Sequence, residues 1–393
     1  MVFSFIHMAD VHFDTPFASK DPAFRRFMRE STRAAFRAGV DLALRKKVNA
    51  FLIAGDLFDN NTLSFATERF LVEQLNRLKD ADINVYYSPG NHDPWGSNFR
   101  LSQISWPANV HIFRTSEPET VPVVGEDGNT LALITGAGHE GNREGRNLAA
   151  AFPECSPKGV PHIGLLHTMV TGTSEGEHER YAPSTLPDLV QKGYTYWALG
   201  HVHVRSILSQ NPMIVYSGNL MGRNSRETGA KGAYLVEVDT TGQPRINFHT
   251  LAPVCWHDLT VGNLDEIRDL EGLEREIFNI VTGYLDERAQ YGDPLLKINL
   301  SGPTPLFAEL DNEDDRQTLT DLLKESLNLR FLEISVKGLV RQVDPAEYRE
   351  GPHVLSEVLS LLDTLKAGTP NKKASGAAAA QAGASVESRA GES

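Results

Sequence analysis

The feature that most constrains this chain is a set of five short polar stretches, each of which follows a short apolar run. The stretches are Asp10-Val11-His12, Gly55-Asp56-Leu57-Phe58-Asp59, Gly90-Asn91-His92-Asp93, Leu166-His167-Thr168 and Gly200-His201-Val202-His203. Short apolar runs of this kind are typical of buried strands. In layered α/β proteins functional groups gather at the carboxyl ends of strands, so the pattern predicts one polar site assembled from distant parts of the chain.

The residue types in these stretches favour metal binding. Carboxylate, amide and imidazole groups occur together, and divalent ions accept all three as ligands. The two cysteines, Cys155 and Cys255, are far apart and lack a Cys-x-x-Cys spacing, so neither a disulfide framework nor a thiolate zinc site is expected. The donors are roughly what two adjacent ions need, and a two-metal hydrolase is the leading hypothesis.

The order of predicted elements indicates an α/β fold. Strands are expected over 3–9, 51–54 and 84–87, and helices over 22–47 and 64–79. Between Val110 and Ile134 the pattern changes to short strands separated by glycine-containing turns, as a second sheet requires. With the period-2 geometry of a strand, Asp10 and His12 would point to the same side and grip one ion together.

The chain beyond residue 250 predicts further units without metal-ligand pairs. Strands are expected over 257–261, 295–300 and 331–337, with helices over 265–288 and 311–327. A helix over 353–366 has an apolar face that serves either its own domain or a partner. We expect a catalytic domain (1–250), a capping domain (251–345), a partner-docking helix (346–366) and a disordered tail (367–393).

The formal net charge of −13 at first argues against a nucleic-acid partner, because such binding depends on Lys and Arg. Residues 251–350, however, contain 21 Asp and Glu against 10 Lys and Arg. The excess acid therefore lies mostly outside the predicted metal site. The chain also has no apolar window of the roughly 18 residues that a membrane span needs, and its first residues lack the pattern of a signal peptide, so we expect a cytoplasmic protein.

Together the five stretches resemble the complete motif series of the calcineurin-like metallophosphoesterases over about the first 250 residues. Within that superfamily, segments 5–17, 89–95 and 106–111 resemble the bacterial DNA repair exonucleases of the SbcD and YhaO type. The resemblance implies an α/β fold in which a two-sheet sandwich flanked by helices is followed by a small α+β capping domain.

The resemblance also implies a ligand set for two divalent ions. One ion would be held by Asp10, His12, Asp56 and His203, and the other by Asp56, Asn91, His167 and His201. A hydroxide shared between the ions would attack phosphorus. Ligation by nitrogen and oxygen suits Mn²⁺, Fe²⁺ or Zn²⁺, and the nuclease branch favours Mn²⁺.

His92 is not needed as a ligand in this scheme. It is expected beside the scissile phosphate, where it would stabilise the transition state or protonate the leaving 3′ oxygen. Asp59 is expected to orient His92, as the corresponding acidic residue does in the phosphatase branch.

Two loops are candidates for substrate contacts. Segment 217–226 is polar, basic and glycine-rich, and its Arg223 and Arg226 are expected to line a phosphate groove. Segment 136–141 formally matches a dinucleotide fingerprint, but it lies in the middle of the chain without a clear βαβ partner. We prefer a loop over the site, with His139 as a substrate contact.

The predicted function is a two-metal phosphodiester hydrolase, a Mn²⁺-dependent DNA exonuclease or endonuclease in DNA repair. The alternative is a phosphomonoesterase or cyclic-nucleotide phosphodiesterase with the same metals, which the acidic region beyond residue 250 motivates. A non-catalytic subunit of a nuclease complex fits less well, because an unused site has no physical reason to keep a cluster of charge. The chain has no Walker-type ATP-binding loop, so it is not expected to hydrolyse ATP itself. The nucleases that it resembles pair with an SMC-like ABC ATPase, and the resemblance therefore implies DNA and such an ATPase as partners. A second copy of the chain is a further expected partner.

Overall fold

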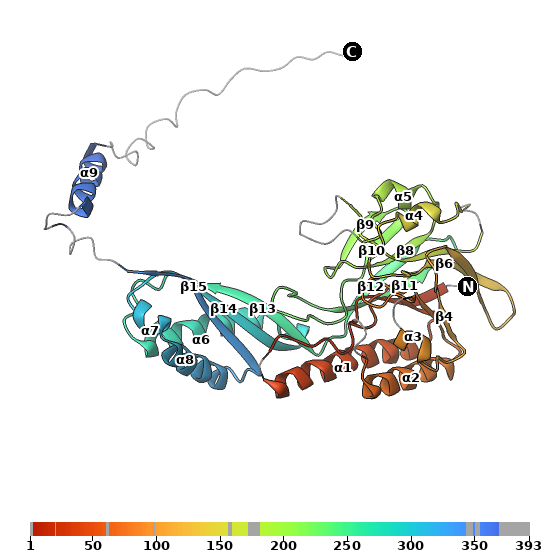
Figure 1. Ribbon diagram of the computed structural model, residues 1–393, viewed down its shortest axis with the longest axis horizontal. Helices are drawn as coiled ribbons and strands as arrows, with labels where there is room; N and C mark the ends of the chain where they lie inside the picture. The colour runs from red at the N-terminus through yellow and green to blue at the C-terminus, as the bar shows by residue number, and fades with distance from the viewer. Residues whose placement is uncertain are drawn as a thin grey trace, which may run out of the picture.

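The computed structural model describes residues 3–19, 21–59, 63–96, 99–155, 159–171, 181–342, 349 and 354–368. Three sheets form its framework (Figure 1). The first sheet has the order β12 (Pro244–Thr250), β11 (Gly232–Val238), β1 (Phe3–Met8), β2 (Ala50–Ile53), β3 (Asn84–Tyr87) and β4 (Val110–Ile112). The second has the order β5 (Glu119–Val124), β6 (Thr130–Ala137), β7 (His162–His167), β8 (Tyr196–Gly200), β10 (Met213–Tyr216) and β9 (Ser206–Gln210). The third consists of β13 (Val254–Val261), β14 (Asp293–Thr304) and β15 (Phe331–Arg341).

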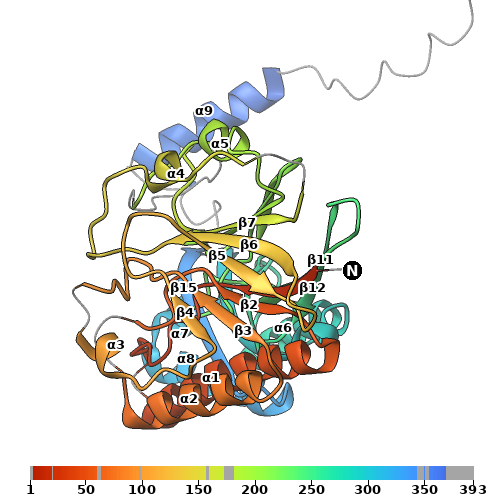
Figure 2. The same cartoon turned by 90° about the vertical axis from the view of Figure 1, so that its right-hand side faces the viewer.

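The described helices flank these sheets, except for α9, which lies apart from them (Figure 1). They are α1 (Pro22–Lys46), α2 (Phe65–Lys79), α3 (Phe99–Gln103), α4 (Leu148–Ala151), α5 (Leu186–Val190), α6 (Leu270–Asp286), α7 (Phe307–Asp311), α8 (Glu313–Ser326) and α9 (Val354–Gly368), with a short 3₁₀ turn at Ala289–Tyr291. Figure 2 shows α1 and α2 below the two large sheets and α4 and α5 above them. The two large sheets and these helices form a four-layered sandwich, which confirms the predicted fold class.

The surroundings of β1 explain why its sequence is almost continuously apolar. Phe5 packs between the two large sheets with Tyr196, whereas Ile6 and Met8 face the α1 side with Phe36. Both faces of β1 are therefore buried, so neither set of alternating side chains needs to be polar. β1 to β4 pair in parallel, and their carboxyl ends meet at one edge of the sheet.

Both long helices of the first layer begin at clear capping signals. The Asp21 side chain accepts a hydrogen bond from the Ala23 backbone N–H, and Pro22 occupies the first helical position. The Ser64 side chain accepts from the Thr67 backbone N–H at the start of α2. These helices agree with the predicted ranges to within a residue or two.

The region beyond residue 250 forms a parallel sheet, because β13 and β15 both pair in parallel with β14. Helices α6 and α8 pack on it through a separate apolar cluster that includes Leu273 and Leu319. Phe24 of α1 stacks on Phe331 at 4.6 Å between ring centroids, which joins this region to the first sheet's helical layer. The predicted strand and helix order is observed, and the predicted domain boundaries remain a prediction.

Helix α9 is drawn apart from the sheets, and its apolar side chains are exposed (Figure 1). Most of the predicted tail, 367–393, lies outside the described residues. Within the residues that are described, no helix combines the length and apolarity that crossing a membrane demands.

The dinucleotide-like segment 136–141 does not open a long helix. β6 ends at Ala137, and the next helix is the short α4 at Leu148–Ala151. A Cβ atom on Gly136 would lie 2.4 Å from the Phe113 ring, and one on Gly138 would lie 2.0 Å from the Phe113 carbonyl oxygen. Close packing against Phe113 therefore explains these two glycines without a bound phosphate.

Candidate metal centre

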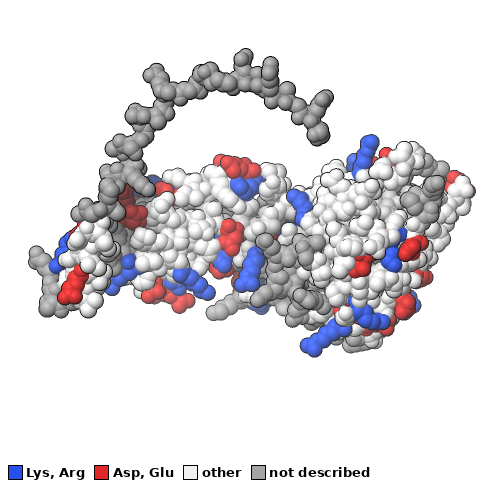
Figure 3. Space-filling view, turned by 90° about the horizontal axis from the view of Figure 1, so that it is seen from above, with Lys and Arg blue, Asp and Glu red and all other residues white. Residues whose placement is uncertain are grey.

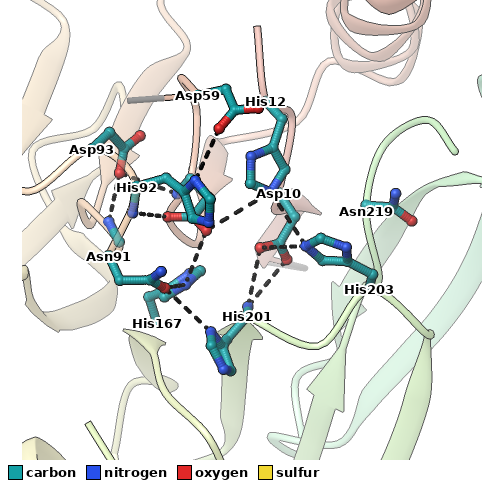
Figure 4. Close-up of polar contacts among 12 residues, drawn as sticks. Asp10, His12, Asp59, Asn91, His92, Asp93, His167, His201, His203 and Asn219 are labelled. Carbon is teal, nitrogen blue, oxygen red and sulfur yellow. Dashed lines mark hydrogen bonds and ion pairs between the residues drawn. The ribbon is translucent and has the colours of Figure 1, made fainter. Parts of the chain in front are cut away.

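The five polar stretches meet at one place, at the edge where the two stacked large sheets come together. Asp10, Asp56 and Asn91 follow β1, β2 and β3 of the first sheet. Figure 4 shows Asp10 and Asn91 among the side chains gathered at this place. The last residue of β7 is His167, and His201 follows β8 directly. Because the strands run parallel within each group, their carboxyl ends deliver these side chains to a common centre.

The backbone leaves the strand conformation before the first ligands. β1 ends at Met8, and Asp10 and His12 both have φ of 50°, so the expected strand alternation at these two residues is wrong. Asp56 and His201 also have positive φ, at 49° and 103°. Four non-glycine residues in this uncommon region at one site indicate a locally strained backbone of the kind found at functional sites.

Hydrogen bonds between the loops hold this conformation. The backbone N–H of Asp10 donates to the Gly55 carbonyl at 3.1 Å, and the N–H of His12 donates to the Asp56 carbonyl at 2.9 Å. The loop after β1 therefore lies directly against the loop after β2. The side chains of Asp10, His12 and Asp56 converge because backbone hydrogen bonds join the two turns.

One group of donor atoms surrounds His12 Nε2. This atom lies 3.2 Å from His203 Nε2 and 3.7 Å from Asp56 Oδ2. The third neighbour, Asp10 Oδ1, lies 3.8 Å from His203 Nε2. These four residues are the ones that the sequence motifs assign to the first ion.

A second group of donor atoms surrounds Asn91 Oδ1. It lies 3.0 Å from His167 Nε2 and 3.3 Å from His201 Nδ1. His167 Nε2 is in turn 3.4 Å from Asp56 Oδ2. The same Asp56 oxygen therefore borders both groups, as a carboxylate shared by two ions would.

The arrangement fits metal ions better than it fits hydrogen bonding within the protein. Ligand atoms about 2.0–2.2 Å from an ion, at angles of about 90–110°, lie roughly 3–3.5 Å from one another. The observed separations of 3.0–3.8 Å include that spacing. Sets that combine Asp10, His12 and His203, or Asp10, Asp56 and His167, have all their ligand atoms within 4.8 Å. We conclude that the donor set suits divalent ions.

The protonation states also suit metal binding. Burial lowers the pKa of His12 and His167 well below the ordinary value and lowers the pKa of His201 to about 3. These imidazoles are therefore neutral, as metal ligands must be. Burial and the charge of Asp56 raise the pKa of Asp10. The centre thus holds carboxylates that bound cations would keep ionised.

Two glycines of the motifs are required by close approach. A Cβ atom on Gly90 would lie 2.2 Å from Asp56 Oδ1, and one on Gly200 would lie 1.7 Å from the Ala54 carbonyl oxygen. Both distances are far below a normal contact. Glycine before Asn91 lets the loop after β3 approach the loop after β2, and glycine before His201 lets the second sheet approach the first, so that all these loops share one centre.

His92 and Asp59 form a pair at the open side of the centre. His92 Nδ1 lies 2.9 Å from Asp59 Oδ1, and the His92 side chain is 33% exposed. Burial alone would lower the pKa of His92, but the hydrogen bond with Asp59 and the charges of Asp56 and Asp59 outweigh it and raise that pKa to about 9. His92 is therefore protonated at neutral pH, with Nε2 as its second donor.

The three expected substrate contacts lie in different surroundings. The Arg223 guanidinium lies 3.9 Å from Asp59 Oδ2 and 3.2 Å from His203 Nδ1, so it borders the centre. Arg226 is exposed and lines a neighbouring pocket. His139 does not overhang the site. It is fully buried, and its Nε2 lies 2.8 Å from the His167 carbonyl oxygen, which leaves it no surface for touching a substrate.

Two further carboxylates support the centre, and the sequence motifs gave neither a role. Asp93 is fully buried and accepts hydrogen bonds from the backbone N–H groups of Gly90, Asp56 and Phe58 at 2.7, 3.2 and 3.1 Å. Its position in the Gly-Asn-His-Asp stretch was the available signal. Glu227 lies behind His203 and had no such signal, because it stands alone in a loop.

Comparison with known proteins agrees with this geometry. The model of the calcineurin-like phosphoesterase family matches residues 3–205, which is more than half of the chain. The metallophosphoesterase YhaO of Bacillus subtilis is 38% identical over 92% of this chain and 90% of its own length.

More distant relatives include DNA double-strand break repair proteins named Mre11. The protein of Archaeoglobus fulgidus is 24% identical over 92% of this chain and 80% of its own length. That of Sulfurisphaera tokodaii is 27% identical over 51% of this chain and 49% of its own length. The family match and the extent of the similarity to YhaO lead to one conclusion: the chain belongs to the calcineurin-like phosphoesterase family and is a metal-dependent phosphoesterase.

Proposed function

We propose that this protein is a two-metal phosphodiester hydrolase that cleaves DNA as an exonuclease or endonuclease in DNA repair. The observation that carries the proposal is the pair of donor groups that share Asp56 Oδ2, beside a protonated His92. The similarity to proteins named for double-strand break repair supports DNA as the substrate.

Each residue of the centre has a distinct part in this proposal. Two bound ions would supply Lewis-acid stabilisation of the phosphate and activate water as the nucleophile. His92 donates a proton from Nε2 to the leaving 3′ oxygen, and Asp59 holds the ring through Nδ1. Arg223 places its positive charge at the edge of the centre, where a phosphate oxygen gains negative charge.

A pocket beside the centre supports a polymeric substrate. It has a volume of about 510 Å³, and His203 forms part of its wall. Arg205, Arg226 and Lys231 also line it. The Arg205 guanidinium stacks over the Phe248 ring at 4.0 Å, and Lys231 Nζ donates to the His203 carbonyl at 2.9 Å. Phosphates that flank the scissile bond would find positive charge here.

The rest of the surface is less favourable to DNA. Figure 3 shows basic and acidic side chains interspersed on one face rather than gathered into a broad basic area. We therefore propose that DNA is held close to the metal centre and its pocket, over a short length of strand. Binding of this kind falls steeply with salt concentration.

The second candidate is a phosphomonoesterase or cyclic-nucleotide phosphodiesterase with the same centre. The acidic charge of the region beyond residue 250 favours this second candidate. For example, the first turn of α8 contains Glu313, Asp314 and Asp315. Acidic side chains on this region repel a long polyanion that extends over it more than they repel a small ester confined to the centre. Rapid turnover of a small nucleotide without DNA cleavage would decide for this candidate.

We propose Mn²⁺ as the working metal, with Fe²⁺ and Zn²⁺ as competitors. Imidazole, carboxylate and amide donors without sulfur are compatible with all three ions. The purified metal-free protein is incubated with a mixture of the three ions, and elemental analysis then ranks the ions by the amount bound.

The exposed helix α9 supports the proposal of a protein partner. Val354, Leu355, Leu361 and Leu365 are between 53% and 76% exposed. We propose that an SMC-like ABC ATPase docks on α9. We also propose that the chain forms a homodimer and that it acts in the cytoplasm. Deletion of residues 352–393 tests the docking, because unchanged co-purification with the ATPase would refute it.

A nuclease assay tests the central proposal. Single-stranded, blunt and hairpin DNA are incubated with the protein in Mn²⁺, Mg²⁺ or Zn²⁺, beside a chromogenic phosphomonoester and a cyclic nucleotide. We expect Mn²⁺-dependent DNA cleavage that falls about 10²–10⁴-fold in His92→Ala, the usual range for loss of a general acid. DNA left intact by the wild type, or equal cleavage by the two proteins, would refute it.

A further inference from the structure

Glu227 is a largely covered carboxylate directly behind the metal-ligand candidate His203. It lies between β10 and β11, and its side chain is 12% exposed. One oxygen, Oε1, lies 2.8 Å from His203 Nδ1. The other, Oε2, accepts from Asn219 Nδ2 at 2.7 Å and from the Arg223 backbone N–H at 2.7 Å. The carboxylate is therefore fixed by donors on several sides.

The contact with Nδ1 determines which nitrogen of His203 is available to an ion. A carboxylate accepts a hydrogen bond, and at 2.8 Å the contact with Glu227 Oε1 is shorter than the 3.2 Å approach of Arg223 Nη2 to Nδ1. Arg223 Nη2 donates instead to Glu227 Oε1 at 3.3 Å, so His203 Nδ1 carries the proton and Nε2 keeps its lone pair. His203 Nε2 is the atom that faces the centre, 3.2 Å from His12 Nε2. Glu227 thus selects the tautomer and the ring orientation that the first donor group requires.

The neighbouring ligand candidate His167 is supported differently. Its Nδ1 lies 3.0 Å from the Ala54 carbonyl oxygen, which is a neutral acceptor. A carboxylate makes a ligating imidazole more basic than a carbonyl does. Support by Glu227 therefore affects the ion that His203 would hold and not the ion held by Asn91, His167 and His201.

The loop that carries Glu227 is fastened at both ends. The Trp256 indole N–H donates to the Gly222 carbonyl at 3.0 Å, and the Gly229 backbone N–H donates to the Trp256 carbonyl at 3.4 Å. A Cβ atom on Gly222 would lie 2.6 Å from the Glu227 carbonyl oxygen and 2.8 Å from the Trp256 ring. The closed loop gives Glu227 a fixed position relative to His203.

We propose that Glu227 is a positioning residue for the metal ligand His203, and that it sets the affinity of one ion of the pair. The inference rests on the proposed metal centre, but it does not depend on DNA as the substrate. Removal of a carboxylate that supports a ligating histidine lowers metal affinity about 10–100-fold. Only one of the two binding events should weaken.

Calorimetric titration of the metal-free, full-length protein with Mn²⁺ tests this inference. The variants are Glu227→Gln, which keeps the shape of the side chain, and Glu237→Gln on the exposed face of β11 as the matched control. We expect two binding events in each of the three proteins. In Glu227→Gln one of the two should be about 10–100-fold weaker than in the wild type and the control, and the other should be unchanged. Equal affinities in all three proteins, or equal weakening of both events, would overturn the inference.

A crystal structure of the Mn²⁺-loaded wild type provides a test that needs no variant. We expect His203 to ligate through Nε2, with Nδ1 still hydrogen-bonded to Glu227. Ligation through Nδ1, or a His203 ring turned away from Glu227, would overturn the inference even if Glu227→Gln failed to fold. Two tightly bound ions without DNA cleavage would refute the proposed substrate and leave the role of Glu227 standing.

Discussion

His92 Nδ1 lies 2.9 Å from Asp59 Oδ1, and this pair joins the loop after β3 to the loop after β2. Asp59 is itself held by Thr15, whose hydroxyl donates to Oδ2 at 3.0 Å. Burial opposes ionisation of Asp59, but the hydrogen bond and charge of His92 outweigh it and lower the Asp59 pKa. The pair is therefore an ion pair with a fixed geometry at the open side of the metal centre.

Replacing Asp59 should change how activity depends on pH. A general acid must be protonated, so activity is lost as pH rises through the His92 pKa, which Asp59 helps to raise to about 9. Asp59→Asn removes the charge and keeps the size. We expect the alkaline limb of the pH–rate profile to move to lower pH. The pH profile of kcat/KM, which reports the groups of the free enzyme, measures this shift. An unmoved limb would show that His92 does not act as the acid.

Replacing Arg226 should weaken DNA binding in proportion to one lost phosphate contact. Arg226 is exposed in the pocket beside His203. We expect Arg226→Ala to reduce the slope of log affinity against log salt by about 1 for duplex DNA. Arg275→Ala on the exposed face of α6 is the control. A slope that changes equally in both variants would place the DNA elsewhere.

Gly90 should not tolerate a side chain. A Cβ atom there would lie 2.2 Å from Asp56 Oδ1 and 2.9 Å from the Asp56 backbone nitrogen. We expect Gly90→Ala to displace Asp56 and to abolish tight binding of both ions, because Asp56 borders both donor groups. Gly283→Ala in α6 is the control, since nothing lies within 4 Å of its Cβ position. Two Mn²⁺ per chain in Gly90→Ala, measured by elemental analysis, would contradict the shared role of Asp56.

His7 should make the fold sensitive to mild acid. This residue of β1 is fully buried against the second sheet, and its Nδ1 lies 2.9 Å from the Tyr196 hydroxyl. Burial lowers the pKa of His7 to about 3. The unfolded chain binds this proton at about 6.5, so stability falls as pH drops from about 6.5 to about 3. In His7→Gln the slope of unfolding free energy against pH should be shallower by up to ~1.4 kcal/mol per unit. Urea titrations across that range measure the slope, and identical slopes would contradict a neutral buried His7.

The sequence was sufficient to predict the fold class because the first strands are buried on both faces. Runs such as 51–54 have no polar alternation, which is typical of strands in a parallel sheet covered on both faces. In the structure the side chains of Asp21 and Ser64 cap the starts of α1 and α2, close to the predicted starts at 22 and 64.

The geometry of the site was harder to predict. Strand periodicity gave no warning that Asp10 and His12 adopt positive φ, because the turn is held by hydrogen bonds that their backbone N–H groups donate to carbonyls of another loop, those of Gly55 and Asp56. His139 was misplaced for a similar reason, since its burial depends on packing against His167. Glu227 was missed because its contact with His203 arises only when the loop before β11 folds back.

The measurement that tests the whole account most directly is anomalous diffraction from crystals of the protein grown with Mn²⁺. We expect two manganese peaks, one bordered by Asp10, His12 and His203, the other by Asn91, His167 and His201, with Asp56 touching both. Crystals that diffract well and show no manganese peak among these residues, or a single peak that Asp56 does not touch, would contradict it.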